Sequence, residues 1–65
     1  MTRAQAQIAF VNKHKICHKY FLPDEYVFLN ENNKMEDENG TILNKKDFWI
    51  SRGSSAFDEG WFIVE

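Results

Sequence analysis

The segment DFWISRGSSAFDEGWFIVE, residues Asp47–Glu65, contains five of the ten aromatic side chains of this chain, including both tryptophans. In a chain of 65 residues these rings are the largest apolar surfaces available, so we expect the core to form on them. The segment ends in Trp61–Val64, four large apolar or β-branched residues in a row. Such a run predicts a strand that is buried on both faces, or buried on one face and offered to a partner on the other.

Length and composition predict one small domain that spans residues 1–65. A chain of this size buries only about 60% of its unfolded surface, which leaves no room for a second core. The chain is 43% hydrophobic and has one proline and three glycines, a composition typical of a folded protein. Because apolar burial and conformational entropy nearly cancel at this size, association with a partner or with a second copy would add stability.

The sequence also indicates a compartment. Cys17 is the only cysteine, so a disulfide within the chain is excluded and a reducing, intracellular environment is expected. The apolar run Ile8–Val11 is far shorter than a signal-peptide core of about 7–15 residues. No segment approaches the roughly 20 apolar residues of a membrane span. We therefore expect a cytoplasmic protein with no membrane partner, located in the host-cell cytoplasm if a phage encodes it.

The best candidate for a helix is Thr2–Tyr20. Thr2 can cap the first turn, and neither proline nor glycine interrupts the segment. Helical periodicity gathers most of its apolar residues on one broad face, with Lys13 in the middle of that face. A second, narrower stripe contains Ile8 and Val11. Two apolar faces indicate a helix that is sandwiched or that meets another molecule, although two exposed apolar residues are also ordinary.

The middle of the chain predicts strands. Tyr26–Leu29 is a compact run of strand formers whose length fits a short buried strand, with a helical turn as the alternative. Residues Lys34–Leu43 predict a hairpin, because Asn39-Gly40 is the sequence favoured in a type I′ turn. The hairpin strands would be Lys34–Glu38 and Thr41–Leu43.

Asn44 predicts the start of a short helix, since Asn44-Lys45-Lys46-Asp47 resembles a capping box with Asp in place of Glu. Gly53 would follow the end of this helix. Together these elements predict an α+β fold in a small single domain. A long N-terminal helix would pack on a three- to four-stranded, mainly antiparallel sheet, with a short helix before the last strand.

No pattern in the chain predicts an enzyme. His14, Cys17 and His18 spell HKICH and could share one side of a helix as zinc ligands, but no other cysteine or histidine is present for a second ligand pair. The serines lie in turn-like sequence without a nucleophile elbow. Adjacent carboxylates such as Asp58-Glu59 are usually solvated rather than desolvated in a pocket. We expect no catalytic residue, no cofactor and no metal.

The charge distribution suggests two alternatives that involve nucleic acid. The first 20 residues carry four bases and no acid, whereas residues 21–65 carry ten acids and four bases. Lys15 and Lys19 on one face of a basic N-terminal helix could contact phosphates, although the net charge of −2 argues against nucleic acid as the partner of the whole protein. The acidic body could instead mimic nucleic acid and block an enzyme that binds it.

The aromatic content favours a non-enzymatic protein-protein interaction module. Tyr, Trp and Arg are enriched in binding hot spots. We predict a partner-binding surface at Trp49 and Arg52, which are three residues apart on the short helix, together with Asp58 and Glu59.

The stripe of Ile8 and Val11 is a second predicted surface and would make a homodimer. A small acidic protein of this kind would act as an inhibitor or regulator of the type that phages and mobile elements encode.

Overall fold

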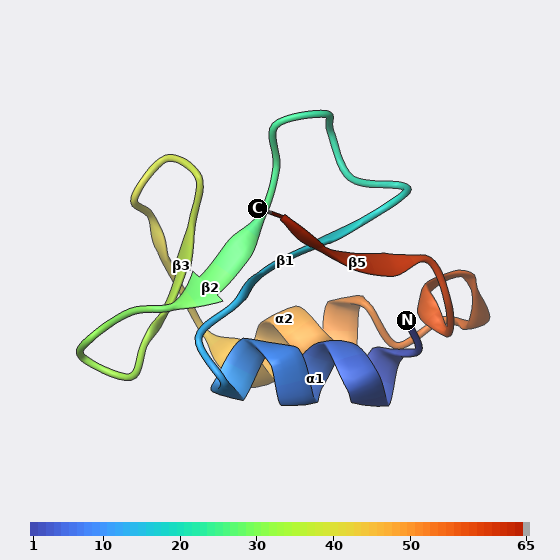
Figure 1. Ribbon diagram of the computed structural model, residues 1–65, viewed down its shortest axis with the longest axis horizontal. Coiled ribbons are helices and arrows are strands. Elements are labelled where there is room, and N and C mark those ends of the chain that lie inside the picture. Colours follow the sequence, from blue (N-terminus) through green and yellow to red (C-terminus); the bar gives the residue numbers. More distant parts are fainter. Residues whose placement is uncertain (65) are drawn as a thin grey trace.

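The computed structural model describes residues 1–64, so residue 65 of the predicted domain lies outside the described part. It shows two helices packed on one side of a five-stranded antiparallel sheet (Figure 1). In chain order the elements are α1 (Arg3–Val11), β1 (Lys15–His18), β2 (Val27–Leu29), β3 (Met35–Asp37), β4 (Ile42–Leu43), α2 (Lys45–Ser51), the 3-10 helix η1 (Ser55–Phe57) and β5 (Trp61–Val64).

The predicted α+β domain is confirmed, with an N-terminal helix, an antiparallel sheet and a second helix before the last strand. The sheet is larger than predicted, because five strands are present instead of three or four. Their order is β4-β3-β2-β1-β5, which places β2 in the centre and β4 and β5 at the two edges.

Helix α1 begins where the sequence predicts. The Thr2 hydroxyl oxygen accepts the Gln5 N–H at 3.1 Å, and the Gln5 side-chain oxygen accepts the Thr2 N–H at 2.9 Å. This reciprocal capping box satisfies two backbone donors that the first helical turn would otherwise leave free.

The predicted continuation of this helix to Tyr20 is wrong, because α1 ends at Val11. Lys13 adopts a left-handed conformation with φ of 70°. Its N–H donates to the Phe10 carbonyl at 3.0 Å, and the His14 N–H donates to the Ala9 carbonyl at 3.0 Å. These two bonds form a Schellman motif, whose left-handed position glycine usually occupies. With lysine at that position, the sequence shows no helix stop.

Replacing Lys13 by glycine is expected to raise the free energy of unfolding by about 0.5–1 kcal/mol. A residue with a Cβ atom in the left-handed conformation destabilises the folded state by roughly 1–2 kcal/mol. Glycine removes this cost, but its greater freedom in the unfolded chain lowers the gain in stability by about 0.4–1 kcal/mol. Chemical denaturation of both proteins measures the change. Lys13→Ala is the control, since it keeps the Cβ atom and loses the 3.4 Å hydrogen bond from Lys13 Nζ to the Asn30 carbonyl. A glycine variant no more stable than the alanine variant would contradict this account.

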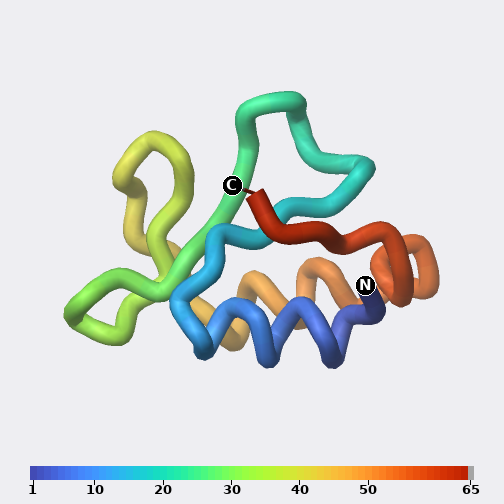
Figure 2. The backbone as a smooth tube through the Cα atoms, viewed as in Figure 1, coloured from blue at the N-terminus to red at the C-terminus, as the bar shows by residue number. Residues whose placement is uncertain are grey.

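Strand β1 is formed by residues that the helical periodicity of the sequence predicts to be part of the long helix. It pairs antiparallel with β5, from Lys15↔Val64 to His18↔Trp61, and with β2 on its other side. Figure 2 shows the red C-terminal strand beside the blue segment that follows α1. Both neighbours of β1 come from later in the chain, so long-range pairing overrides the local helical periodicity.

The predicted central strand and hairpin are confirmed as β2, β3 and β4. The predicted type I′ turn is wrong, because Gly40 has a positive φ of 79° but Asn39 does not. The Gly40 N–H donates to the Asp37 carbonyl at 3.1 Å, which makes a type I turn followed by a left-handed glycine. The Asp37 carboxylate holds this loop by accepting the N–H groups of Asn39 and Thr41, each at 2.9 Å.

The core lies between the two helices and one face of the sheet. Asn44 caps α2 as predicted, since its side-chain oxygen accepts the Asp47 N–H at 2.9 Å. Trp61 is only 1% exposed, and its Nε1–H donates to the Phe57 carbonyl at 2.7 Å. The C-terminal aromatic segment therefore supplies the centre of the core, as predicted. The buried apolar residues are Ala6, Ala9, Phe10, Ile16, Cys17, Val27, Met35, Phe48 and Trp61.

Candidate protein-interaction surface

Neither helix covers the second face of the sheet in the described part of the chain. The core side chains of the strands, such as Ile16 and Trp61, pack with those of α1 and α2. Because successive side chains of a strand point to opposite faces, their neighbours point away from the helices. We call this second surface the open face. Its residues on and next to the strands are Lys15, Cys17, Tyr26, Phe28, Glu36, Ile42, Phe62 and Val64.

Two aromatic rings and a lysine meet in the middle of the open face. The ring centroids of Tyr26 and Phe28 lie 6.2 Å apart. The Nζ atom of Lys15, from the neighbouring strand β1, lies 4.9 Å from the centroid of the Tyr26 ring. These contacts place the three side chains on one side of the sheet, as the strand alternation requires. Lys15 makes a cation–π interaction with Tyr26.

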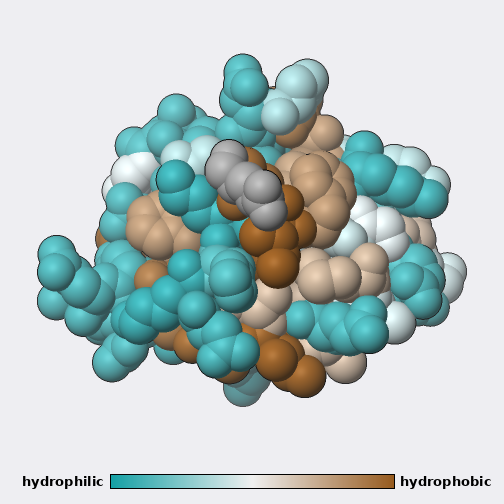
Figure 3. Space-filling model, in the orientation of Figure 1, coloured by the Kyte–Doolittle hydropathy of each residue, from teal (hydrophilic) through white to brown (hydrophobic). Residues whose placement is uncertain are grey.

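Apolar side chains also lie at both edges of the open face. Phe62 on β5 is 47% exposed and Ile42 on β4 is 51% exposed. Tyr26, Phe28 and Val64 are half-buried and do not belong to the core cluster. Figure 3 shows hydrophobic surface beside the end of β5. These apolar side chains lie on the same face of the sheet as Tyr26 and Phe28.

Charged side chains of the open face lie on opposite sides of β2. Lys15 lies on β1 and Glu36 lies on β3. The open face therefore carries a basic side chain on one side of its aromatic centre and an acidic side chain on the other.

Cys17 on this face and Glu38 in the turn after β3 have unusual environments. The Oε2 atom of Glu38 is buried and has no hydrogen-bond partner among residues 1–64. Burial raises the pKa of the Cys17 thiol; a backbone hydrogen bond at His18 opposes this, and the charges of Glu25 and Glu38 add to it. A thiol with a raised pKa stays protonated at neutral pH, so Cys17 is a poor nucleophile.

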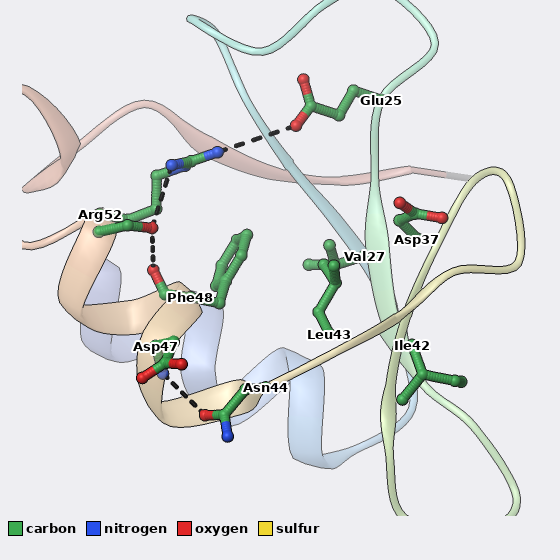
Figure 4. Close-up of a pocket in the computed structure, with 10 residues that line it drawn as sticks. Glu25, Val27, Asp37, Ile42, Leu43, Asn44, Asp47, Phe48 and Arg52 are labelled. Carbon is green, nitrogen blue, oxygen red and sulfur yellow. Dashed lines mark hydrogen bonds and ion pairs between the residues drawn. The ribbon is translucent and has the colours of Figure 1, made fainter.

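A pocket of about 520 Å³ lies on the other side of the sheet, between α2 and strands β2 to β4 (Figure 4). Val27, Leu43 and Phe48 line its apolar part, and an ion pair of 3.9 Å between Arg52 and Glu25 crosses one end of it. Its polar rim consists of Glu25, Asp37, Asn44, Asp47, Ser51 and Arg52.

Arg52, predicted to bind a partner, is engaged within the protein. Its guanidinium carbon lies 5.2 Å from the ring centroids of Phe21 and Phe48 and 5.5 Å from that of Phe57. Together with the Glu25 ion pair, these contacts fix the arginine over the aromatic cluster. Partner binding by Arg52 stays a prediction.

The side chains of Trp49 and Asp58, predicted together with Arg52, also have contacts within the protein. Trp49 is half-buried and packs against Phe10 and Trp61, with ring centroids at 6.4 and 5.3 Å. Asp58 forms an ion pair of 3.1 Å with Arg3, whose Nε–H donates to the Arg52 carbonyl at 3.2 Å.

Glu59 is exposed, and its carbonyl oxygen lies 2.6 Å from His18 Nε2. Arg3 thus links Arg52 and Asp58, and partner binding by the four residues stays a prediction.

The predicted stripe on the first helix is exposed. Ile8 and Val11 are each 61% exposed on α1. Figure 3 shows hydrophobic atoms at the lower edge of the molecule, over α1. Homodimerisation through this stripe stays a prediction.

The placement of the HKICH segment on a helix is wrong, because Lys15, Cys17 and His18 lie on β1. Lys15 and Lys19 consequently belong to the sheet and not to a basic helix. His18 is buried, whereas His14 is exposed beside the end of α1. Within residues 1–64, no group of three or more His, Cys, Asp and Glu side chains is arranged to hold a metal ion.

The exposed positions of Phe28 and Phe62 on the open face were not predicted from the sequence. The signal that could have found them is the alternation within each strand. Once Val27 and Trp61 are assigned to the core, their neighbours must face the opposite side.

No helix within residues 1–64 combines the length and the hydrophobicity that crossing a membrane requires. Comparison of the chain with protein-family models, with curated proteins and with solved structures found no match.

Proposed function

We propose that this protein is a non-enzymatic protein-interaction module that binds its partner through the open face. The observation that carries the proposal is the sheet with both helices on one side and aromatic side chains on the other. Aromatic residues at the centre of a patch, with charged residues around them, are the usual anatomy of a protein interface. Tyr26 and Phe28 supply such a centre, and Lys15 and Glu36 flank it.

Binding through this face supports a role as a small inhibitor or regulator. A module of 65 residues can act by covering a functional surface of a larger protein. The half-buried rings of Tyr26 and Phe28 lose little conformational freedom on binding, because the sheet already holds them. Rigid aromatic side chains on a preformed surface are well suited to this kind of masking.

Phe62→Glu is expected to abolish capture of the partner by tagged protein from a cell extract, because it places a charge in an apolar interface. Ile50→Glu is the matched control. Ile50 lies on α2, outside the open face, and is 67% exposed, so the same change there should leave capture intact. Both variants should keep the circular dichroism spectrum of the wild type. A partner that both variants capture equally well would show that the open face is not the binding surface.

Binding of single-stranded nucleic acid is a second candidate function, favoured by the position of two lysines. The Nζ atom of Lys15 lies 4.9 Å from the ring centroid of Tyr26, and that of Lys19 lies 5.2 Å from the ring centroid of Tyr20. Bases stack on aromatic rings beside such cationic side chains. Nuclease treatment during the capture experiment separates the two functions, since a signal carried by nucleic acid disappears. The acidic-mimic alternative is tested by the same capture, in which its partner would be a nucleic-acid-binding enzyme.

A further inference from the structure

The residues of the open face are arranged symmetrically about the central strand β2. One row runs across all five strands: Phe28 pairs with Glu36, Glu36 with Ile42, and Lys15 with Val64. Continuing the register of Ile16↔Val27 by one residue brings Phe28 opposite Lys15. The row therefore reads apolar, acidic, aromatic, basic and apolar, in the order Ile42, Glu36, Phe28, Lys15 and Val64.

We propose that the open face binds a second copy of this chain, face to face, about a two-fold axis parallel to β2. This inference rests on the proposed interaction function and names its partner. A rotation about that axis places β1 of one copy over β3 of the other, and β5 over β4, because the strand order β4-β3-β2-β1-β5 is centred on β2. Sheets stacked in this way lie about 10 Å apart with nearly aligned strands.

The chemistry of the row is self-complementary under this rotation. Lys15 of one copy lies over Glu36 of the other. The two-fold axis repeats this contact, so that Glu36 of the first copy lies over Lys15 of the second, as an isologous interface requires. Phe28 lies over its own equivalent at the centre. Ile42 lies over Val64 of the second copy, so that apolar side chains meet at both edges. Each charged side chain of the row therefore faces the opposite charge in the second copy, and each apolar side chain faces an apolar one.

Sedimentation equilibrium over a range of protein concentrations tests the proposal through charge reversal. We expect the wild type to form a dimer that weakens as salt is added. Lys15→Glu and Glu36→Lys should each weaken the dimer about tenfold or more, because each reversal makes two symmetric contacts repulsive. An equimolar mixture of the two variants should restore a dimer, since each variant then meets its complement. Lys46→Glu, at an exposed position of α2, is the charge-matched control and should leave the dimer unchanged.

Three results would overturn the proposal. These are a wild type that remains monomeric at high concentration, a dimer that is insensitive to both reversals, or a mixture of reversed variants that fails to associate. A dimer that Ile8→Glu abolishes, but that the reversals leave intact, would assign self-association to the α1 stripe instead. If the wild type is monomeric and Phe62→Glu still abolishes capture of another protein, the inference fails while the proposed function stands. If Phe62→Glu also leaves capture unchanged, both fail.

Discussion

Replacing Trp61 by alanine is expected to lower the free energy of unfolding by about 3–5 kcal/mol, a large part of the stability of so small a domain. The side chain is 1% exposed, and its ring centroid lies 5.0 Å from that of His18, 5.3 Å from Trp49 and 5.6 Å from Phe21. Its Nε1–H also donates a hydrogen bond to the Phe57 carbonyl. Alanine removes all of these contacts and leaves a cavity that the short helices cannot fill by moving.

Chemical denaturation followed by circular dichroism measures the loss. Phe62→Ala is the matched control, because it truncates the neighbouring ring on the open face. That variant should lose about 1 kcal/mol or less, as surface substitutions usually do. Equal losses in the two variants would mean that the open face contributes as much to stability as the core does, contrary to the structure.

The second large effect is expected for His18→Ala, at about 2–4 kcal/mol. The ring is buried, its Nδ1 atom accepts the Tyr20 N–H at 3.1 Å, and Nε2 lies 2.6 Å from the Glu59 carbonyl. Because Nδ1 is an acceptor, Nε2 carries the proton and donates it to that carbonyl. Alanine leaves both backbone groups without their partner and opens a void beside Phe57, whose ring centroid lies 4.5 Å from that of His18.

Denaturation together with amide hydrogen exchange checks this prediction. The Tyr20 amide should exchange much faster in His18→Ala than in the wild type, because its acceptor has been removed. His14→Ala is the control, since His14 is exposed and should change neither measurement. An unchanged exchange rate at Tyr20 would show that the imidazole is not its acceptor in solution.

Elements with a local signal could be predicted from the sequence. Thr2 and Asn44 cap helices because their side chains accept hydrogen bonds from residues three positions later. The hairpin could be predicted because Gly40 is typical of hairpin loops, and its positive φ closes the loop. The end of α1 was missed because Lys13 takes the left-handed conformation without being glycine. Strand β1 was missed for a different reason, since the partners that make it a strand are distant in the sequence.

The candidate site was harder to predict than the fold. Trp49 and Arg52 were chosen because their side chains are typical of interfaces, yet the structure packs both against other aromatic rings. The open face depends on the register between strands, which decides that Phe28 and Phe62 turn away from the helices. A shift of one residue would bury both rings, and it is excluded only once Val27 and Trp61 are assigned to the core.

The pairing of β1 with β5 also determines when the protein can fold during its synthesis. Helix α1 and the hairpin of β3 and β4 depend on contacts between residues close in sequence, so both can begin to form on the growing chain. The core cannot close at that stage, because β5, which contains Trp61 and pairs with β1, is made after the other elements. The nascent chain must therefore expose Phe10 and Ile16 until β5 has left the ribosome. During that interval, chaperones and proteases have access to apolar residues that the finished domain hides.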